Sequence, residues 1–166
     1  MGCASSVGHK AVHLSLPLSE TQKSLVRETW ETVDQHKNNV GKKMFLRFFE
    51  LNPDYQKLFP EFKGVEPTEL ENTTALYGHA KRVMKAVENA VTSLDDAFSF
   101  AGYLEELGRR HKTRALKPAH LDAMQESLMF TLKELLNHQW THETEEAWNK
   151  LFRFILSTML KGLQST

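Results

Sequence analysis

The amino-acid sequence predicts an all-α protein, and three features support this fold class. Apolar residues recur at intervals of three and four along most of the chain, which is the period of an amphipathic helix. Ser, Thr, Asp and Pro residues mark the ends of these segments, as expected where helices begin and end. No segment shows the two-residue alternation of a half-buried strand. We therefore expect about seven to eight helices.

Length and composition limit the function classes. A chain of 166 residues most simply forms one domain, which we place at residues 19–166, and it buries about two-thirds of its unfolded surface. Its 21 Lys and Arg residues balance 21 Asp and Glu residues, so net charge gives no basis for binding nucleic acid or an acidic membrane. Cys3 is the only cysteine, which excludes an intramolecular disulfide and favours a reducing compartment.

Residues 1–18 are small, polar and irregular, and we expect a flexible N-terminal tail there. The tail lacks the apolar core of a secretory signal, and no apolar run in the chain approaches the eighteen or so residues of a membrane span. The sequence therefore predicts a protein that is soluble or anchored by a lipid.

The first two helices are predicted from their boundaries. Ser19 and Gln22 match a capping box, in which each side chain accepts a hydrogen bond from an unpaired backbone N–H. A second helix is expected at about residues 39–51, because Pro53 disfavours helix at the residue before it. A short turn at residues 54–64 follows and contains Phe59.

The third and fourth helices each place a histidine on an apolar stripe. The third begins near Thr73, and the fourth follows the Ser-Leu-Asp-Asp turn at residues 93–96. Their stripes consist of Leu76, His79, Val83, Val87 and Ala90 or Val91 in the third helix, and of Phe100, Leu104, Leu107 and His111 in the fourth. Because residues three, four and seven apart share a helix face, both histidines are expected to point inward.

Two more helices are expected near the C-terminus, starting at Pro118 and after Thr141. His138 and His142 have the four-residue spacing of a zinc pair on one continuous helix. Thr141 is predicted to cap the last helix and therefore to separate them, which argues against a zinc site.

The inward histidines allow two interpretations. The simpler one is a hydrogen-bonded histidine in an ordinary core. Against it, both stripes are otherwise strongly apolar, and an unpaired imidazole there costs about 1–3 kcal/mol without a polar partner. Two imidazoles that face one apolar slot could instead hold a flat iron cofactor between them.

The order of these residues resembles the globin family, specifically its neuroglobin and globin X branch. Phe59 follows Leu58, His79 comes twenty residues later before Ala-Lys-Arg-Val, and His111 ends Leu-Gly-Arg-Arg-His thirty-two residues further on. The resemblance covers about residues 19–163. It implies a globin fold in which the helices form a three-over-three arrangement that encloses one b-type haem.

The resemblance also implies roles for individual residues. His111 matches the proximal ligand, which binds iron through Nε2, and its Nδ1–H is expected to donate to the carbonyl of Leu107 one turn back. Phe59 matches the residue that wedges the porphyrin, Val83 an aliphatic neighbour of the distal histidine, and Phe45 a wall of the ligand cavity. Leu107 matches the leucine below the porphyrin.

Arg82 is a candidate for a charge-assisted hydrogen bond to a haem propionate. Lys81 and Lys85 compete for that role, and a solvated surface charge is the alternative for Arg82.

His79 matches the distal histidine, and its role separates the functional hypotheses. It either donates a hydrogen bond to iron-bound dioxygen or ligates iron directly, which gives a six-coordinate, bis-histidine haem. The branch resemblance favours direct ligation. An internal ligand that closes 99% of the sites lowers apparent gas affinity roughly a hundredfold.

The N-terminus predicts a lipid anchor independently of the haem hypothesis. Met-Gly-Cys-Ala-Ser-Ser fits the pattern for myristate on Gly2, with Cys3 placed for palmitate. Two acyl chains give stable attachment where one does not. An unmodified tail is the alternative. Globin X proteins also begin with Met-Gly-Cys, which supports a cytoplasmic protein tethered to the inner face of the plasma membrane.

Three functions are consistent with these predictions. The first is a membrane-tethered haem protein that binds O2, NO or CO and acts in electron transfer, nitrite reduction or nitric-oxide signalling. Nitrite reductase or NO dioxygenase activity would require an external reductant, and electron transfer a redox partner. The second is a five-coordinate oxygen store or carrier, and the third a haem-free helical interaction module. Balanced charge favours a monomer.

Overall fold

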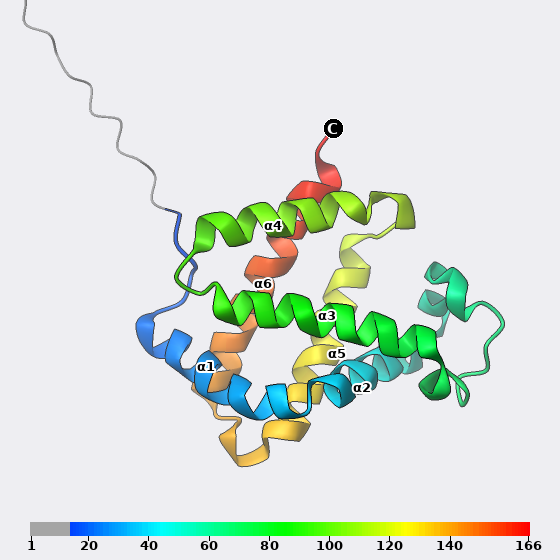
Figure 1. Ribbon diagram of the computed structural model, residues 1–166, viewed down its shortest axis with the longest axis horizontal. Coiled ribbons are helices and arrows are strands. Elements are labelled where there is room, and N and C mark those ends of the chain that lie inside the picture. The colour runs from blue at the N-terminus through cyan, green and yellow to red at the C-terminus, as the bar shows by residue number, and fades with distance from the viewer. Residues whose placement is uncertain (1–13) are drawn as a thin grey trace, which may run out of the picture.

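The computed structural model describes residues 14–166 and contains six α-helices (Figure 1). They are α1 (Glu20–Gln35), α2 (Lys37–Leu51), α3 (Thr74–Thr92), α4 (Ala97–Arg110), α5 (Pro118–Leu136) and α6 (His142–Gln164). Five short 3-10 helices lie between them: η1 (Pro53–Leu58), η2 (Pro60–Phe62), η3 (Leu70–Asn72), η4 (Lys112–Arg114) and η5 (Asn137–Gln139). No strand occurs within residues 14–166, so the predicted all-α class is confirmed.

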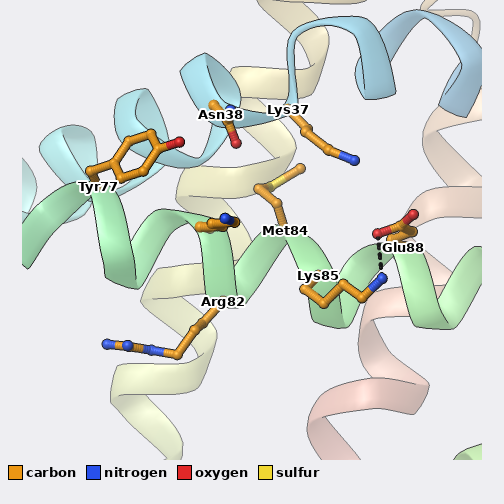
Figure 2. Close-up of a pocket in the computed structure, with 8 residues that line it drawn as sticks. Lys37, Asn38, Tyr77, Arg82, Met84, Lys85 and Glu88 are labelled. Atoms are coloured by element: carbon orange, nitrogen blue, oxygen red, sulfur yellow. Dashed lines mark hydrogen bonds and ion pairs between the residues drawn. The ribbon is translucent and has the colours of Figure 1, made fainter.

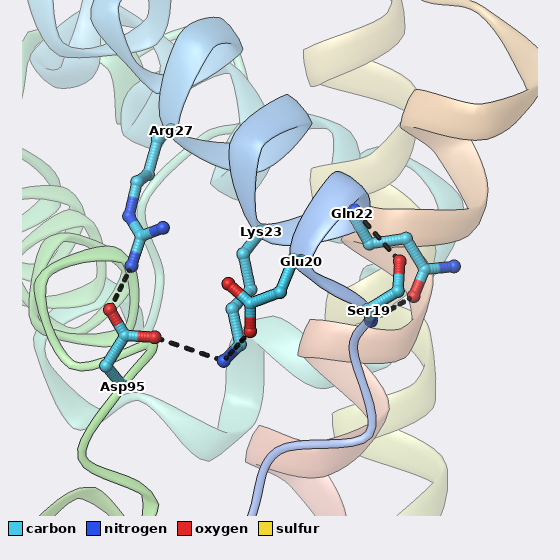
Figure 3. A network of polar contacts seen from close by, with 6 residues as sticks. All are labelled: Ser19, Glu20, Gln22, Lys23, Arg27 and Asp95. Carbon is cyan, nitrogen blue, oxygen red and sulfur yellow. Dashed lines mark hydrogen bonds and ion pairs between the residues drawn. The ribbon is translucent and has the colours of Figure 1, made fainter.

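Side-chain caps begin the helices close to the predicted positions. Ser19 accepts a hydrogen bond from the backbone N–H of Gln22 at 3.1 Å, and the Gln22 side chain accepts one from the N–H of Ser19 at 2.9 Å. This is the predicted capping box, shown in Figure 3. The side chains of Thr73, Asp96 and Thr141 accept from the backbone at the starts of α3, α4 and α6.

The helices pack in two main groups. α4 lies across α6, whereas α2 packs against both α3 and α5, and α1 packs against α6. Figure 1 shows α3 and α4 in front of α5 and α6, with the start of α3 and the end of α4 on the same side of the molecule. This arrangement brings the two histidine-bearing segments to one side of the fold.

Two glycines permit the close contact of α4 with α6. A Cβ atom built on Gly108 would lie 2.1 Å from the carbonyl oxygen of Met159, and one on Gly162 would lie 2.0 Å from that of Glu105. Both distances are far below an ordinary C···O contact. The α4–α6 crossing therefore depends on the absence of a side chain at both positions, and α4 is the helix that ends at His111.

Buried polar and apolar contacts complete the core around α1. The indole N–H of Trp148 on α6 donates to Oγ1 of Thr29 on α1 at 2.9 Å, and both residues are buried. Leu16 and Leu18 are only 5% and 7% exposed. The folded part of the chain therefore begins before Ser19, because these two leucines, which we expected in the tail, cover the core.

An ion-pair network joins α1 to the turn between α3 and α4 (Figure 3). The Asp95 carboxylate lies 3.1 Å from Nζ of Lys23 and 2.7 Å from Nη2 of Arg27. Asp95 is well exposed, so each pair contributes little stability. Among residues 14–166, no helix has the length and apolar character needed to cross a membrane.

Candidate functional site

The two predicted histidines lie on helices that pack on different neighbours. α3, with His79, packs on α2, whereas α4 packs on α6 and ends at His111. Among the described helices, α3 and α4 are not one of the main packing pairs. Both helices are therefore held in place mainly by other helices and not by each other.

His111 is the C-cap residue of α4 and is half-buried. Its Nδ1 lies 2.8 Å from the carbonyl oxygen of Leu107, so the predicted hydrogen bond is confirmed. Because a carbonyl only accepts, Nδ1 carries the proton and Nε2 keeps its lone pair. Within residues 14–166, Nε2 of His111 makes no hydrogen bond. The imidazole is therefore held in the tautomer that a metal ligand requires.

His79 is buried, with 8% of its surface exposed, and aromatic rings surround it. The ring centroids of Phe59 and Phe62 lie 5.4 and 5.5 Å from that of the imidazole, and that of Phe45 lies 6.2 Å away. Phe59 also packs edge-on against Phe45 at 6.0 Å. These rings form an apolar wall on the His79 side and keep water from the imidazole.

Two charged groups contact the His79 ring from different elements. Nη2 of Arg82, one turn further along α3, lies 3.0 Å from Nδ1. Oε1 of Glu61 in η2 lies 3.7 Å from Nε2. Burial lowers the pKa of His79, and the positive charge of Arg82 lowers that pKa further. His79 is therefore a neutral imidazole near pH 7.

The remaining predicted pocket residues occupy the expected helices. Val83 on α3 and Leu107 on α4 are half-buried and pack against the core. Half-burial suits side chains that line a slot rather than fill the centre of the core. Arg82 was a candidate for a propionate contact, and in the structure its guanidinium is hydrogen-bonded to Nδ1 of His79. The propionate contact stays a prediction.

Glu61 and Phe62 contact His79, although neither residue was expected at the site from the sequence. They belong to a 3-10 helix of three residues, which is too short to show a helical period. The only local signal was the preceding Phe-Pro pair, which marks a turn without indicating where its side chains point.

A cavity of about 420 Å³ opens between the η1–η2 turn and η4. Leu58, Pro60 and Glu61 line one side, and Thr113, Arg114 and Ala115 line the other. The cavity lies beside the segment that contains Phe59 and beside η4, which begins directly after His111. Arg114 places a positive charge at this cavity and contributes to the lowered pKa of Glu61, whose main cause is a backbone hydrogen bond.

A second, open groove of about 580 Å³ lies on the outer side of α3, where it faces the start of α2. It is lined mainly by Lys37, Asn38, Tyr77, Lys81, Lys85 and Glu88 (Figure 2). Two of its lysines are already paired, Lys37 with Asp34 and Lys85 with Glu88. Arg82 also lines this groove, but its guanidinium points away from Lys37 in Figure 2 and contacts Nδ1 of His79 at 3.0 Å.

The other histidines do not cluster with further potential metal ligands in the part of the chain that the structure describes. Within residues 14–166, no three His, Cys, Asp or Glu side chains group as metal ligands do. His138 lies in η5 and His142 begins α6, with Thr141 capping α6 between them as predicted. The predicted acylation residues Gly2 and Cys3 lie outside the described residues.

Comparison with known proteins decides the family. The family model described as Globin matches residues 42–159, which is more than half of the chain and includes both His79 and His111. The chain is a globin. The predicted resemblance and the predicted globin fold are thereby confirmed.

Among named relatives, this globin is similar to neuroglobins of fishes. It is 30% identical to neuroglobin-2 of Oncorhynchus mykiss and to neuroglobin of Danio rerio, and 31% identical to neuroglobin of Chaenocephalus aceratus. Each match extends over 146 residues, 87% of this chain and 92% of the relative. The globin therefore belongs to the neuroglobin-like branch.

Two solved structures show the same fold. A hexacoordinated heme protein from an anhydrobiotic tardigrade superimposes with a TM-score of 0.85 at 25% identity, over 90% of this chain and 97% of that one. The hemoglobin of the botfly Gasterophilus intestinalis superimposes with a TM-score of 0.82 at 16% identity, over 89% of this chain and 100% of that one. The second likeness concerns the fold alone.

Proposed function

We propose that this globin binds haem b between His111 and His79 and that it uses the haem for ligand binding and redox chemistry. The observation that carries the proposal is the Nδ1 hydrogen bond of His111 to Leu107, at 2.8 Å, which leaves Nε2 free as a ligand. A solvated surface histidine has no need for this fixed tautomer. Membership of the globin family supports the same conclusion.

The residues of this chain fit the cofactor. His111 would hold the iron, and Leu107 would both orient His111 and contact the porphyrin with its side chain. Phe45, Phe59 and Val83 would supply apolar walls that exclude water. Haem would contribute an iron centre that takes up O2, CO or NO and changes oxidation state.

His79 is proposed as a second, reversible ligand of the same iron. His79 is buried and neutral. The likeness of the whole chain to the tardigrade hexacoordinated heme protein supports direct ligation. His79 would then compete with an external gas for the iron, and the apparent gas affinity would be reduced in proportion to the fraction of open sites. Similar coordination in both oxidation states favours electron transfer over storage.

We further propose that acylation of Gly2 and Cys3 tethers the protein to the cytoplasmic face of the plasma membrane. The support is the sequence motif at residues 1–6 and the two-chain requirement for stable anchoring. At that surface the protein would exchange electrons with a redox partner and, given an external reductant, convert nitrite to nitric oxide or remove nitric oxide.

Absorption spectra of the purified ferrous protein, with and without CO, test the coordination. Six-coordinate low-spin bands before CO, replaced by a CO spectrum, are expected. His79→Leu should give five-coordinate high-spin bands, and His111→Leu should lose most haem. The exposed His138→Gln is the matched control and should resemble the unmodified protein. High-spin bands in the unmodified protein would support oxygen storage, and no haem uptake would refute the proposal.

The tether is tested by expressing the full chain and its Gly2→Ala variant in a eukaryotic cell and separating membranes from cytosol. The unmodified protein should be found with the membranes and the variant in the cytosol. Equal distribution of the two proteins would contradict the tether and leave the haem assignment intact.

A further inference from the structure

Nδ1 of His79 faces a hydrogen-bond donor. If Nε2 ligated iron, Nδ1 would carry a proton and would need an acceptor instead. Nη2 of Arg82 lies 3.0 Å from Nδ1 of His79. A guanidinium has five N–H donors, no acceptor, and a charge that it keeps at all physiological pH values. Nδ1 must therefore be the acceptor in this contact. The neutral imidazole then carries its proton on Nε2.

A second group supports the same tautomer from the opposite side. The Glu61 carboxylate, on η2 rather than α3, lies 3.7 Å from Nε2 of His79. A negative charge near Nε2 attracts an Nε2–H and repels an Nε2 lone pair. Arg82 and Glu61 thus act in the same direction, although they belong to different elements.

This tautomer has opposite consequences for the two roles of His79. An Nε2–H can donate a hydrogen bond to an external ligand, but it cannot ligate iron through Nε2. Ligation requires the proton to move to Nδ1, which already accepts a hydrogen bond from the Arg82 guanidinium. We propose that Arg82 is a positioning residue that holds His79 in the Nε2–H tautomer and thereby opposes its ligation to the haem iron. The inference rests on the proposed function, because it concerns how tightly the sixth site is closed.

The helical spacing places Arg82 beside His79. His79 and Arg82 are three residues apart on α3, a spacing that places side chains on the same helix face. Lys81 and Lys85 lie on the same helix and line the outer groove together with Arg82, but neither lysine makes a hydrogen bond to His79 within the described residues. Lys81 therefore provides a matched control with the same loss of charge.

The experiment compares the haem-loaded protein with Arg82→Met, Arg82→Lys and Lys81→Met. Met removes the donor and retains a long side chain, whereas Lys restores a cationic donor. We expect Arg82→Met to increase the equilibrium constant for His79 ligation about tenfold, which is the effect of losing one hydrogen bond to a charged group. The low-spin fraction of the ferrous protein should rise, and apparent CO affinity should fall by up to the same factor.

Arg82→Lys should lie near the unmodified protein, and Lys81→Met should equal it. Equal spectra and CO affinities for all four proteins would overturn the inference. The same shift in Arg82→Met and Lys81→Met would also overturn it, because a general loss of charge would then explain the effect. A protein that takes up no haem would instead refute the proposed function, so the two failures are distinguishable.

Two further measurements exclude a propionate contact as the cause. Nitrogen-15 NMR of the CO-saturated ferrous protein, in which His79 is released, should show the Nε2–H tautomer, and Arg82→Met should populate Nδ1–H. Reconstitution with haem dimethyl ester removes the propionate charges. The effect of Arg82→Met should persist in that protein, and its disappearance, or an Nδ1–H tautomer in the unmodified protein, would overturn the inference.

Discussion

Gly108→Ala should separate two helices and disturb the site at the same time. A Cβ at position 108 would lie 2.1 Å from the carbonyl oxygen of Met159 and 2.9 Å from its carbonyl carbon. A C···O contact requires about 3.3 Å, so α4 and α6 would have to move apart by roughly 1 Å. Both colliding atoms belong to the α6 backbone, and no side-chain rotation can relieve the contact.

The magnitude follows from two opposing terms. Overpacking of this kind costs about 3 kcal/mol, whereas Ala instead of Gly within a helix returns about 1 kcal/mol. We expect a net loss of about 2 kcal/mol, which lowers the melting temperature of a chain of this size by about 4–8 °C. Gly102 on the same helix has no atom within 4 Å of its built Cβ, so Gly102→Ala should raise the melting temperature by about 2 °C.

Thermal unfolding followed by circular dichroism, at matched haem occupancy, measures both effects. The rate of haem transfer to an acceptor protein provides a functional readout, because α4 positions Leu107 and His111. Gly108→Ala should lose haem faster than Gly102→Ala. If the two variants unfold at the same temperature, the close α4–α6 contact does not determine stability.

Three other changes test individual contacts. Thr29→Val should cost about 2 kcal/mol in urea unfolding because it leaves the buried Trp148 indole N–H unpaired, whereas Thr29→Ser should keep most of that stability. Ser19→Ala should cost about 1 kcal/mol in the same assay by removing the α1 cap, and an unchanged urea midpoint would contradict the capping role. Burial, and then the charge of Lys117, lower the pKa of His120, whose Nδ1 accepts from the backbone N–H of Lys117 at 3.0 Å. Because His120 binds a proton at a higher pH in the unfolded chain than in the folded protein, the free energy of unfolding should fall as the pH drops below about 6.5. His120→Gln, which can keep the cap, should reduce the difference between urea midpoints at pH 7 and pH 5, and an equal difference would contradict this assignment.

The helix boundaries were predictable because local chemistry decides them. The capping box at Ser19, the start of α5 at Pro118 and the cap at Thr141 were each expected from a few neighbouring residues. The second helix begins at Lys37 rather than Asn39, since no side-chain cap marks its start. Leu16 and Leu18 were expected in the tail, because a pair of leucines outside a helical period gives no signal of burial.

The site was predictable where it depends on one helix. The bond from His111 to Leu107 joins residues four apart, so helical geometry alone brings them together. The contact of Glu61 with His79 joins η2 to α3, and no spacing in the sequence indicates it. Arg82 was only a candidate for a propionate contact, because its position three residues after His79 does not show which acceptor its side chain finds.

The sequence by itself determined the helical class, the family and the two histidines, because hydrophobic period, caps and residue order are properties of neighbouring residues. The tertiary structure decided how close α4 and α6 lie, which charges contact His79 and which tautomer that histidine adopts. Those features depend on differences of an ångström between atoms that are distant in the chain, such as Gly108 and Met159, and only packing in three dimensions sets such distances.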